Sequence, residues 1–136
     1  MANQWLLKTE PEEYSFDDLI RDEKTVWDGV ANPLSLKHLR AIRKGDELLI
    51  YHTGNVRAVV GLAKAESDPY PDPSKQNPKI VVMDVVPFRR LAQPVTLESI
   101  KAIPSFRDFE LVRLRRLSVM SVPAALWKRI LQMGER

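Results

Sequence analysis

The sequence has no cysteine and only two histidines, His38 and His52, among its 136 residues. Without cysteine, disulfides and thiolate metal sites are excluded, and the chain is typical of an intracellular protein, so we expect a cytoplasmic location. Two histidines do not favour a multi-histidine metal site, and we expect neither a metal nor a cofactor. No apolar run approaches the roughly 18 residues of a membrane span, and residues 1–4 lead into a strand, not a signal peptide.

The motifs of the common enzyme classes are also missing. There is no Gly-x-Ser-x-Gly elbow, no phosphate-binding glycine loop, no His-Glu-x-x-His and none of the paired cysteines of zinc deaminases. The adjacent acids at 12–13 and 17–18 point in different directions, as solvated charges at a helix start do, and not as a catalytic pair. His52 offers a proton-transfer group, but a strand-end histidine bonded to the backbone is the simpler interpretation. The sequence therefore favours a protein that is not an enzyme.

What the sequence does contain is the material for one globular domain. Its 44% hydrophobic and 29% charged residues are ordinary for a folded protein of this length. We therefore expect a single domain over residues 1–136, present as a monomer. The net charge of +3 permits a phosphate-bearing partner without requiring one.

Apolar runs and turn residues predict an α+β fold. Several strands with short helices between them are typical of a curled, mostly antiparallel sheet, whereas a parallel Rossmann-type sheet needs strands that alternate with long helices. Ser15 and Thr96 are helix-capping residues, and Pro123 is a favourable first helical residue. The expected strands cover residues 4–8, 47–52, 56–65, 80–91 and 116–122, with a short extended piece ending at Trp27; the expected helices cover residues 16–22, 35–42, 96–103, 106–114 and 123 onward, and residues 66–79 form a long loop.

Two aromatic residues, Trp27 and Tyr51, lie at the ends of strand-like segments beside polar groups. We expect them to line one concave site for a flat ligand, because each offers apolar area and one hydrogen-bonding tip. The alternative is that both rings simply fill the core, where most aromatic residues lie.

Basic residues form a second feature. Arg113, Arg115 and Arg116 precede the last expected strand, and Lys8 ends the first. Such a run is either a solvated face or a groove that follows a phosphate backbone, as in proteins that bind single strands. A further interpretation is that residues 111–117, rich in arginine and leucine, contact another protein.

Ordered sequence blocks run along nearly the whole chain, at residues 5–11, 14–19, 27–30, 44–46, 51–53, 70–73, 94–97 and 116–119. The first reads Trp-Leu-Leu-Lys-Thr-Glu-Pro and the third Trp-Asp-Gly-Val, and together the blocks resemble EVE-domain proteins, which include the thymocyte nuclear protein family. The resemblance implies a PUA-like fold, a curled mixed β-barrel with short peripheral helices, related to the YTH modules. Ala31 and Pro33 stand where the family pattern has arginine and tyrosine.

The resemblance also implies a function. EVE domains are thought to bind modified bases, particularly methylated or hydroxymethylated cytosine, in DNA or RNA through an aromatic pocket. The alternative is a pocket for a free nucleoside, a nucleotide or a small anionic metabolite. By motif, the ligand-binding positions are Lys8, Thr9, Glu10, Tyr14, Ser15, Trp27, Gly29, Val30, Asn32, Tyr51, His52, Tyr70, Asp72 and Ser118, and the nucleic-acid backbone is expected at Lys8, Arg113, Arg115 and Arg116.

Overall fold

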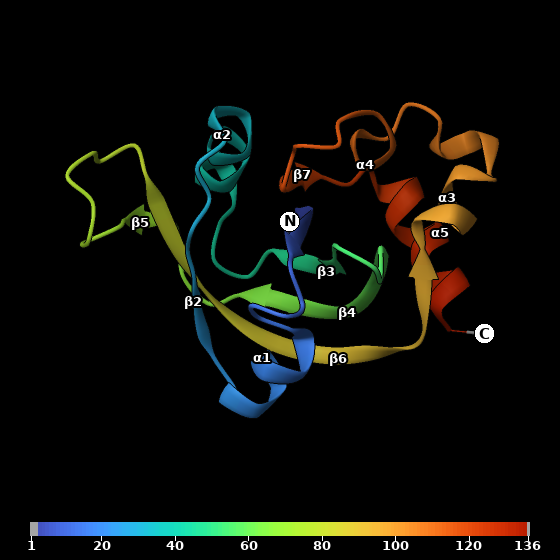
Figure 1. The fold of residues 1–136 in the computed structure, drawn as a ribbon, viewed down its shortest axis with the longest axis horizontal. Coiled ribbons are helices and arrows are strands. Elements are labelled where there is room, and N and C mark those ends of the chain that lie inside the picture. The colour runs from blue at the N-terminus through green and yellow to red at the C-terminus, as the bar shows by residue number, and fades with distance from the viewer. Residues whose placement is uncertain (1–2, 136) are drawn as a thin grey trace.

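A strongly curled sheet forms the centre of the molecule, which the computed structural model describes over residues 3–135 (Figure 1). The strands are β1 (Gln4–Thr9), β2 (Thr25–Trp27), β3 (Glu47–His52), β4 (Ala58–Ala65), β5 (Tyr70–Pro71), β6 (Val81–Thr96) and β7 (Val119–Ser121). Their order is β2-β6-β4-β3-β1-β7, with β5 paired to β6. β1 and β3 run parallel, and the other pairs are antiparallel. The predicted α+β class is confirmed, with a mixed sheet curled into a half-barrel.

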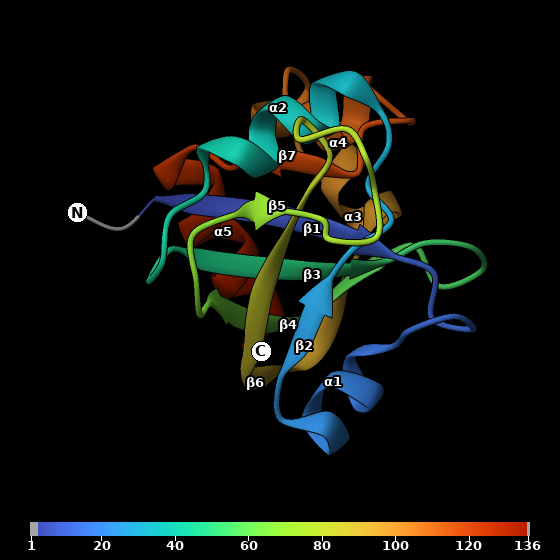
Figure 2. The ribbon, with the colours of Figure 1, turned by 90° about the vertical axis from the view of Figure 1, so that its left-hand side faces the viewer.

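Short helices cover both faces of this sheet. They are α1 (Phe16–Asp22), α2 (Pro33–Ala41), α3 (Leu97–Lys101), α4 (Glu110–Arg113) and α5 (Ala124–Gly134), with a 3₁₀ turn η1 (Pro104–Phe106). In Figure 1, α3, α4 and α5 gather on the right, and in Figure 2 β2 crosses in front of β3 and β4, with α1 below them.

Alternating side chains of the strands divide the interior into two cores. Trp5 and Leu7 of β1 point into the first core, together with apolar residues of α1, α2 and β2. Leu6 points into the second core, which the apolar residues of α3, α4 and α5 complete. Because successive strand residues face opposite sides, a stretch buried on both faces is apolar without interruption, as Trp5–Leu7 of β1 is.

The longest strand, β6, curls enough to pair with β2 and β5 near its start and with β4 along the rest. The β4–β6 register shifts between Val59 and Gly61, as at a β-bulge. Gly61 lies under Phe16, the first residue of α1, and a Cβ at this position would come within 2.5 Å of the Phe16 ring. A glycine here therefore lets α1 lie directly on the sheet.

The predicted start of the second helix is wrong by two residues. The helix begins at Pro33, and the Asn32 side chain, not Ser35, caps it by accepting the Ser35 N–H at 3.0 Å. Proline suits the first helical position because it has no N–H to leave unpaired. Ser35 is instead fully buried, and its Oγ accepts the Ser118 N–H at 2.9 Å, which ties α2 to the segment before β7.

Other predicted boundaries also differ from the structure. The last strand is only three residues long, because Leu117 donates its N–H to the Leu114 carbonyl at 3.1 Å and closes a turn. The strand expected from residue 56 begins at 58, because Arg57 adopts a left-handed φ of 46°. The helix expected over 106–114 is divided into η1 and α4, the long loop contains β5, and Pro123 is the residue before α5.

Candidate functional site

A hollow of about 540 Å³ lies between the end of β1 and the segment formed by β2 and the residues that follow it. Three segments and one further residue line it: Lys8–Glu10, Glu13–Tyr14, Thr25–Val30 and Ser118. We call it the Trp27 pocket. It gathers eight of the predicted ligand positions, namely Lys8, Thr9, Glu10, Tyr14, Trp27, Gly29, Val30 and Ser118.

Trp27 forms one wall of the Trp27 pocket. β2 holds it beside Met83 of β6, and only 7% of the residue is exposed, so most of the indole packs in the first core. Gly29 has a φ of 76°, a left-handed conformation that glycine adopts without strain, and this turns the chain toward the buried Val30. The indole is thus fixed by packing before any ligand arrives.

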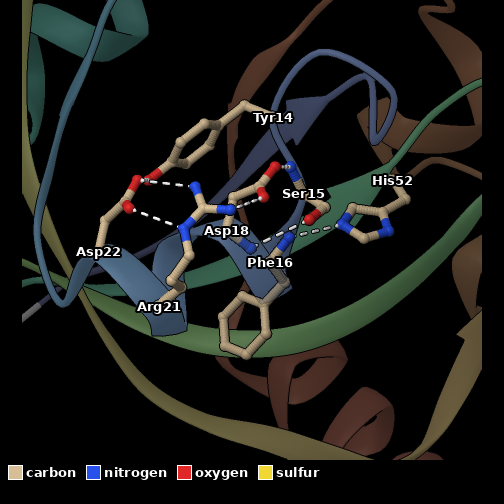
Figure 3. Close-up of polar contacts among 7 residues, drawn as sticks. All are labelled: Tyr14, Ser15, Phe16, Asp18, Arg21, Asp22 and His52. Atoms are coloured by element: carbon tan, nitrogen blue, oxygen red, sulfur yellow. Dashed lines mark hydrogen bonds and ion pairs between the residues drawn. The ribbon is translucent and has the colours of Figure 1, made fainter.

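Tyr14 contributes the second aromatic group of the pocket. Its carbonyl accepts the Thr9 hydroxyl at 2.7 Å, and its own hydroxyl donates to Asp22 Oδ2 at 2.9 Å. Figure 3 shows Arg21 between Asp18 and Asp22, with N···O distances of 2.8 and 3.0 Å. Burial is the largest influence on the pKa of Tyr14 and raises it, and the hydrogen bond to Asp22 raises it as well.

Ser15 and His52 do not line the Trp27 pocket; they fix the start of α1 (Figure 3). Ser15 Oγ accepts the Asp18 N–H at 3.0 Å, and the Asp18 carboxylate accepts the Ser15 N–H at 2.8 Å. His52 Nε2 accepts the Phe16 N–H at 3.0 Å, and burial lowers the pKa of His52. The simpler interpretation of His52, a strand-end histidine bonded to the backbone, is confirmed.

The expectation that Trp27 and Tyr51 share one hollow is wrong. Tyr51 follows Ile50, which points into the first core with Trp27, so Tyr51 points into the second core and is 3% exposed. Its ring lines a separate hollow of about 230 Å³, which we call the Tyr51 hollow. Lys8 lies between the two spaces and lines both, with Nζ 5.7 Å from the centre of the Tyr51 ring.

Three more predicted ligand residues lie outside the Trp27 pocket. Tyr70 donates to Asp84 Oδ1 at 2.6 Å, and this bond raises the pKa of Tyr70 to about 12. The Asp72 carboxylate accepts the N–H and the hydroxyl of Ser74, which lower its pKa and order the loop. Asn32 caps α2.

Sequence reasoning missed four lining residues, Glu13, Thr25, Val26 and Asp28. Asp28 lies between the predicted positions Trp27 and Gly29. It follows the end of β2, where the alternation of strand side chains no longer indicates which way a residue points. Together with Glu10, the two new acids make three carboxylates against one ammonium group, that of Lys8. The lining therefore favours a ligand that presents hydrogen-bond donors over a small anion.

The predicted basic cluster is brought together beside α4. Arg113, Arg115 and Arg116 are exposed and line a groove of about 450 Å³. Lys8 joins this cluster, because its Nζ donates to the Arg115 carbonyl at 3.1 Å. Over residues 3–135 we find no group of three or more acidic or histidine side chains placed to hold a metal ion, and no helix there combines the length and apolar character needed to cross a bilayer.

A curled mixed half-barrel with helices on both faces and a hollow where β1 and β2 end defines a PUA-like domain. The family model of the EVE domain matches residues 3–133, and the chain therefore belongs to the EVE-domain family. The expected family and fold are both confirmed.

Known proteins resemble the chain in sequence and in structure. It is 32% identical to thymocyte nuclear protein 1 of Rattus norvegicus, over 74% of this chain and 56% of the rat protein. The chain thus spans about half the length of the curated relatives it matches. An NMR structure of a Rhodopseudomonas palustris protein superimposes with a TM-score of 0.92 and 36% identity, over 98% of this chain and 93% of that chain. A crystal structure of human THYN1 protein in complex with 5-methylcytosine-containing DNA superimposes with a TM-score of 0.90 and 27% identity, over 99% of both chains.

Proposed function

We propose that this chain binds nucleic acid without catalysis and holds a modified base, methylated or hydroxymethylated cytosine, in the Trp27 pocket. The observation that carries the proposal is a pocket with two aromatic walls in a fold that superimposes on human THYN1 protein, itself solved in complex with 5-methylcytosine-containing DNA. A single domain, a monomeric state and a cytoplasmic location belong to the same proposal, and RNA remains an alternative strand to DNA.

The lining supplies the contacts that a cytosine needs. Trp27 and Tyr14 offer aromatic surface, and stacking on one aromatic group stabilises a bound base by roughly 1–3 kcal/mol. The exocyclic amine of cytosine is a donor, and carboxylates are its usual partners, a role that Asp28 and Glu13 fit. Val26 and Val30 offer apolar contact to a methyl group.

The energetics favour a single strand or a distorted site over a regular duplex. Unstacking and unpairing a base from a duplex costs a few kcal/mol, about as much as stacking in the pocket returns. Net affinity must then come from phosphate contacts, which weaken as salt rises. From the sequence, these contacts are expected at Lys8, Arg113, Arg115 and Arg116.

A free nucleoside or nucleotide is the second candidate ligand. Ala31 replaces the arginine of the family pattern, so one group suited to a phosphate or a base edge is missing. The three carboxylates in the lining weigh against a small anionic metabolite, since like charges repel.

Fluorescence polarisation tests the proposal with labelled single-stranded and duplex oligonucleotides that differ only at one central cytosine, either plain, 5-methyl or 5-hydroxymethyl. We expect tighter binding of a modified strand than of the plain strand, with both affinities falling as salt rises. Equal affinity for all three bases, or no binding, contradicts modified-base recognition. Competition by free 5-methylcytidine as strong as that of the oligonucleotide favours the second candidate.

A further inference from the structure

The Tyr51 hollow collects positive charge from four separate segments. Lys8 is the last but one residue of β1, Arg57 precedes β4, Lys101 ends α3 and Arg115 follows α4, and all four line the hollow. Its lining contains no acidic residue. This composition is the reverse of the Trp27 pocket on the other side of Lys8, where carboxylates predominate.

Within residues 3–135, these four cations have no salt-bridge partner. Among residues 3–135, no carboxylate oxygen lies within 4.0 Å of a charged nitrogen of any of them. Arg89 and Arg90, by contrast, pair with Glu135 at 2.6 Å and with Asp17, whereas Arg113 and Arg116 of the neighbouring groove share the lack of a salt-bridge partner among residues 3–135. Burial lowers the pKa of Lys8, as expected of an ammonium group partly withdrawn from water without an opposite charge.

The hollow is held in shape by backbone contacts. Arg57 has a φ of 46°, which few residues other than glycine adopt, and its carbonyl accepts the Leu97 N–H at 2.8 Å. This bond joins the β3–β4 loop to the start of α3, the helix that carries Lys101. The Arg115 carbonyl in turn accepts Lys8 Nζ at 3.1 Å. Two of the four cationic segments are thus tied to each other, and so are the remaining two.

We propose that the Tyr51 hollow binds a phosphate group. Arginine and lysine are the side chains that proteins use for phosphate, and a charged donor forms a strong bond to a phosphate oxygen. The phosphate is either a phosphodiester of the strand whose modified base enters the Trp27 pocket, which rests on the proposed function, or a free phosphate or nucleotide. Lys8 lines both spaces, so one strand can contact the two sites together.

This inference narrows the assignment of the nucleic-acid backbone made from the sequence. Lys8 and Arg115 keep that role, and Arg57 and Lys101 join them. Arg113 and Arg116 line only the neighbouring groove. They therefore provide a matched control, because a double variant at these two positions removes the same charge from the same region.

The experiment compares Lys101→Ala/Arg115→Ala with Arg113→Ala/Arg116→Ala in the full chain, by polarisation with the plain and 5-methyl single strands over a range of salt. The loss of two phosphate contacts to a single strand makes the negative slope of log K against log salt shallower by about 1.4. If binding converges near 1 M salt, the affinity at 0.1 M falls on the order of 25-fold for both strands, since 10 raised to 1.4 is about 25. We expect this loss from the first pair and a clearly smaller one from the control pair.

The readouts separate the two proposals. If the wild-type chain binds plain and 5-methyl strands equally, the base-pocket proposal is wrong. A difference in salt slope between the two double variants would still support the phosphate site. Titration of the ¹⁵N-labelled chain with inorganic phosphate identifies the source: shifts confined to residues 8, 57, 101 and 115, with no oligonucleotide binding, assign the site to free phosphate. Equal slopes for the two double variants, together with no phosphate-induced shifts at these residues, overturn the inference.

Discussion

Two tyrosines give a controlled test of the Trp27 pocket. Tyr14 lines the pocket and Tyr70 does not, yet each is partly buried and each hydroxyl donates to an aspartate, Asp22 or Asp84. Tyr14→Leu removes the ring on which a base would stack, a loss of roughly 1–3 kcal/mol. We therefore expect the dissociation constant for a 5-methylcytosine single strand to rise about 5- to 160-fold. Tyr70→Leu is expected to leave it unchanged.

Tyr14→Leu should lose more affinity than Tyr70→Leu, whereas Tyr70→Leu should lose more unfolding free energy than Tyr14→Leu. The Tyr14 bond to Asp22 is exposed, so its loss costs about 0.5–1.5 kcal/mol of unfolding free energy at most, whereas the part-buried, 2.6 Å bond of Tyr70 to Asp84 matters more. Urea unfolding measures stability, and fluorescence polarisation measures binding. A Tyr70→Leu variant that binds as weakly as Tyr14→Leu, or a Tyr14→Leu variant with wild-type affinity, would refute the argument.

Three further predictions concern the scaffold that positions the pocket. Burial lowers the pKa of His52 in the folded chain below its ordinary 6.5, so the unfolded chain binds the imidazole proton at a higher pH than the folded chain does. The stability contributed by neutral His52 is therefore complete above pH 6.5 and falls as the pH drops from 6.5 toward the pKa of the folded chain. His52→Gln should flatten this part of a pH series of thermal melts. Gly61→Ala forces a Cβ into the Phe16 ring and should lower the unfolding free energy by about 1–3 kcal/mol in urea, where an unchanged midpoint would contradict the packing argument. Asp46→Ala removes the acceptor of the buried Trp5 indole N–H at 2.9 Å and of the Asn3 and Arg43 N–H groups. It should cost at least about 1–3 kcal/mol, measured in the same way, with wild-type stability as the contrary result.

The sequence predicted best those elements whose signals are local. The helix over residues 16–22 begins and ends as expected, because Ser15 and Asp18 form a capping box that needs no distant partner. The second helix start was wrong because Asn32 and Ser35 are both capping residues. The choice between them depends on Ser118, which is far away in sequence and occupies the Ser35 hydroxyl.

The candidate site could be predicted only in part for a similar reason. Motif blocks at the ends of β1 and β2 identified Trp27, Tyr14 and Lys8, and the structure brings these together in one pocket. To decide whether Tyr51 and Trp27 share a pocket, one must know which side chains of β3 face the same side of the sheet as those of β2. The two strands do not pair, so their sequences alone do not give this. The curl of β6 sets that relation, and no residue pattern in the sequence reports it.

The central claim is that a modified base enters the pocket beside Trp27, and the indole N–H signals of the chain test it most directly. The three tryptophans have different surroundings. The Trp5 indole donates to Asp46, Trp127 packs in the second core, and Trp27 alone of the three lines the pocket. In ¹H–¹⁵N spectra titrated with a 5-methylcytosine single strand, with Trp27→Phe to assign the signal, we predict a large shift of the Trp27 indole and small shifts of the other two. A Trp27 signal that stays in place when the chain is saturated with this strand would contradict the account.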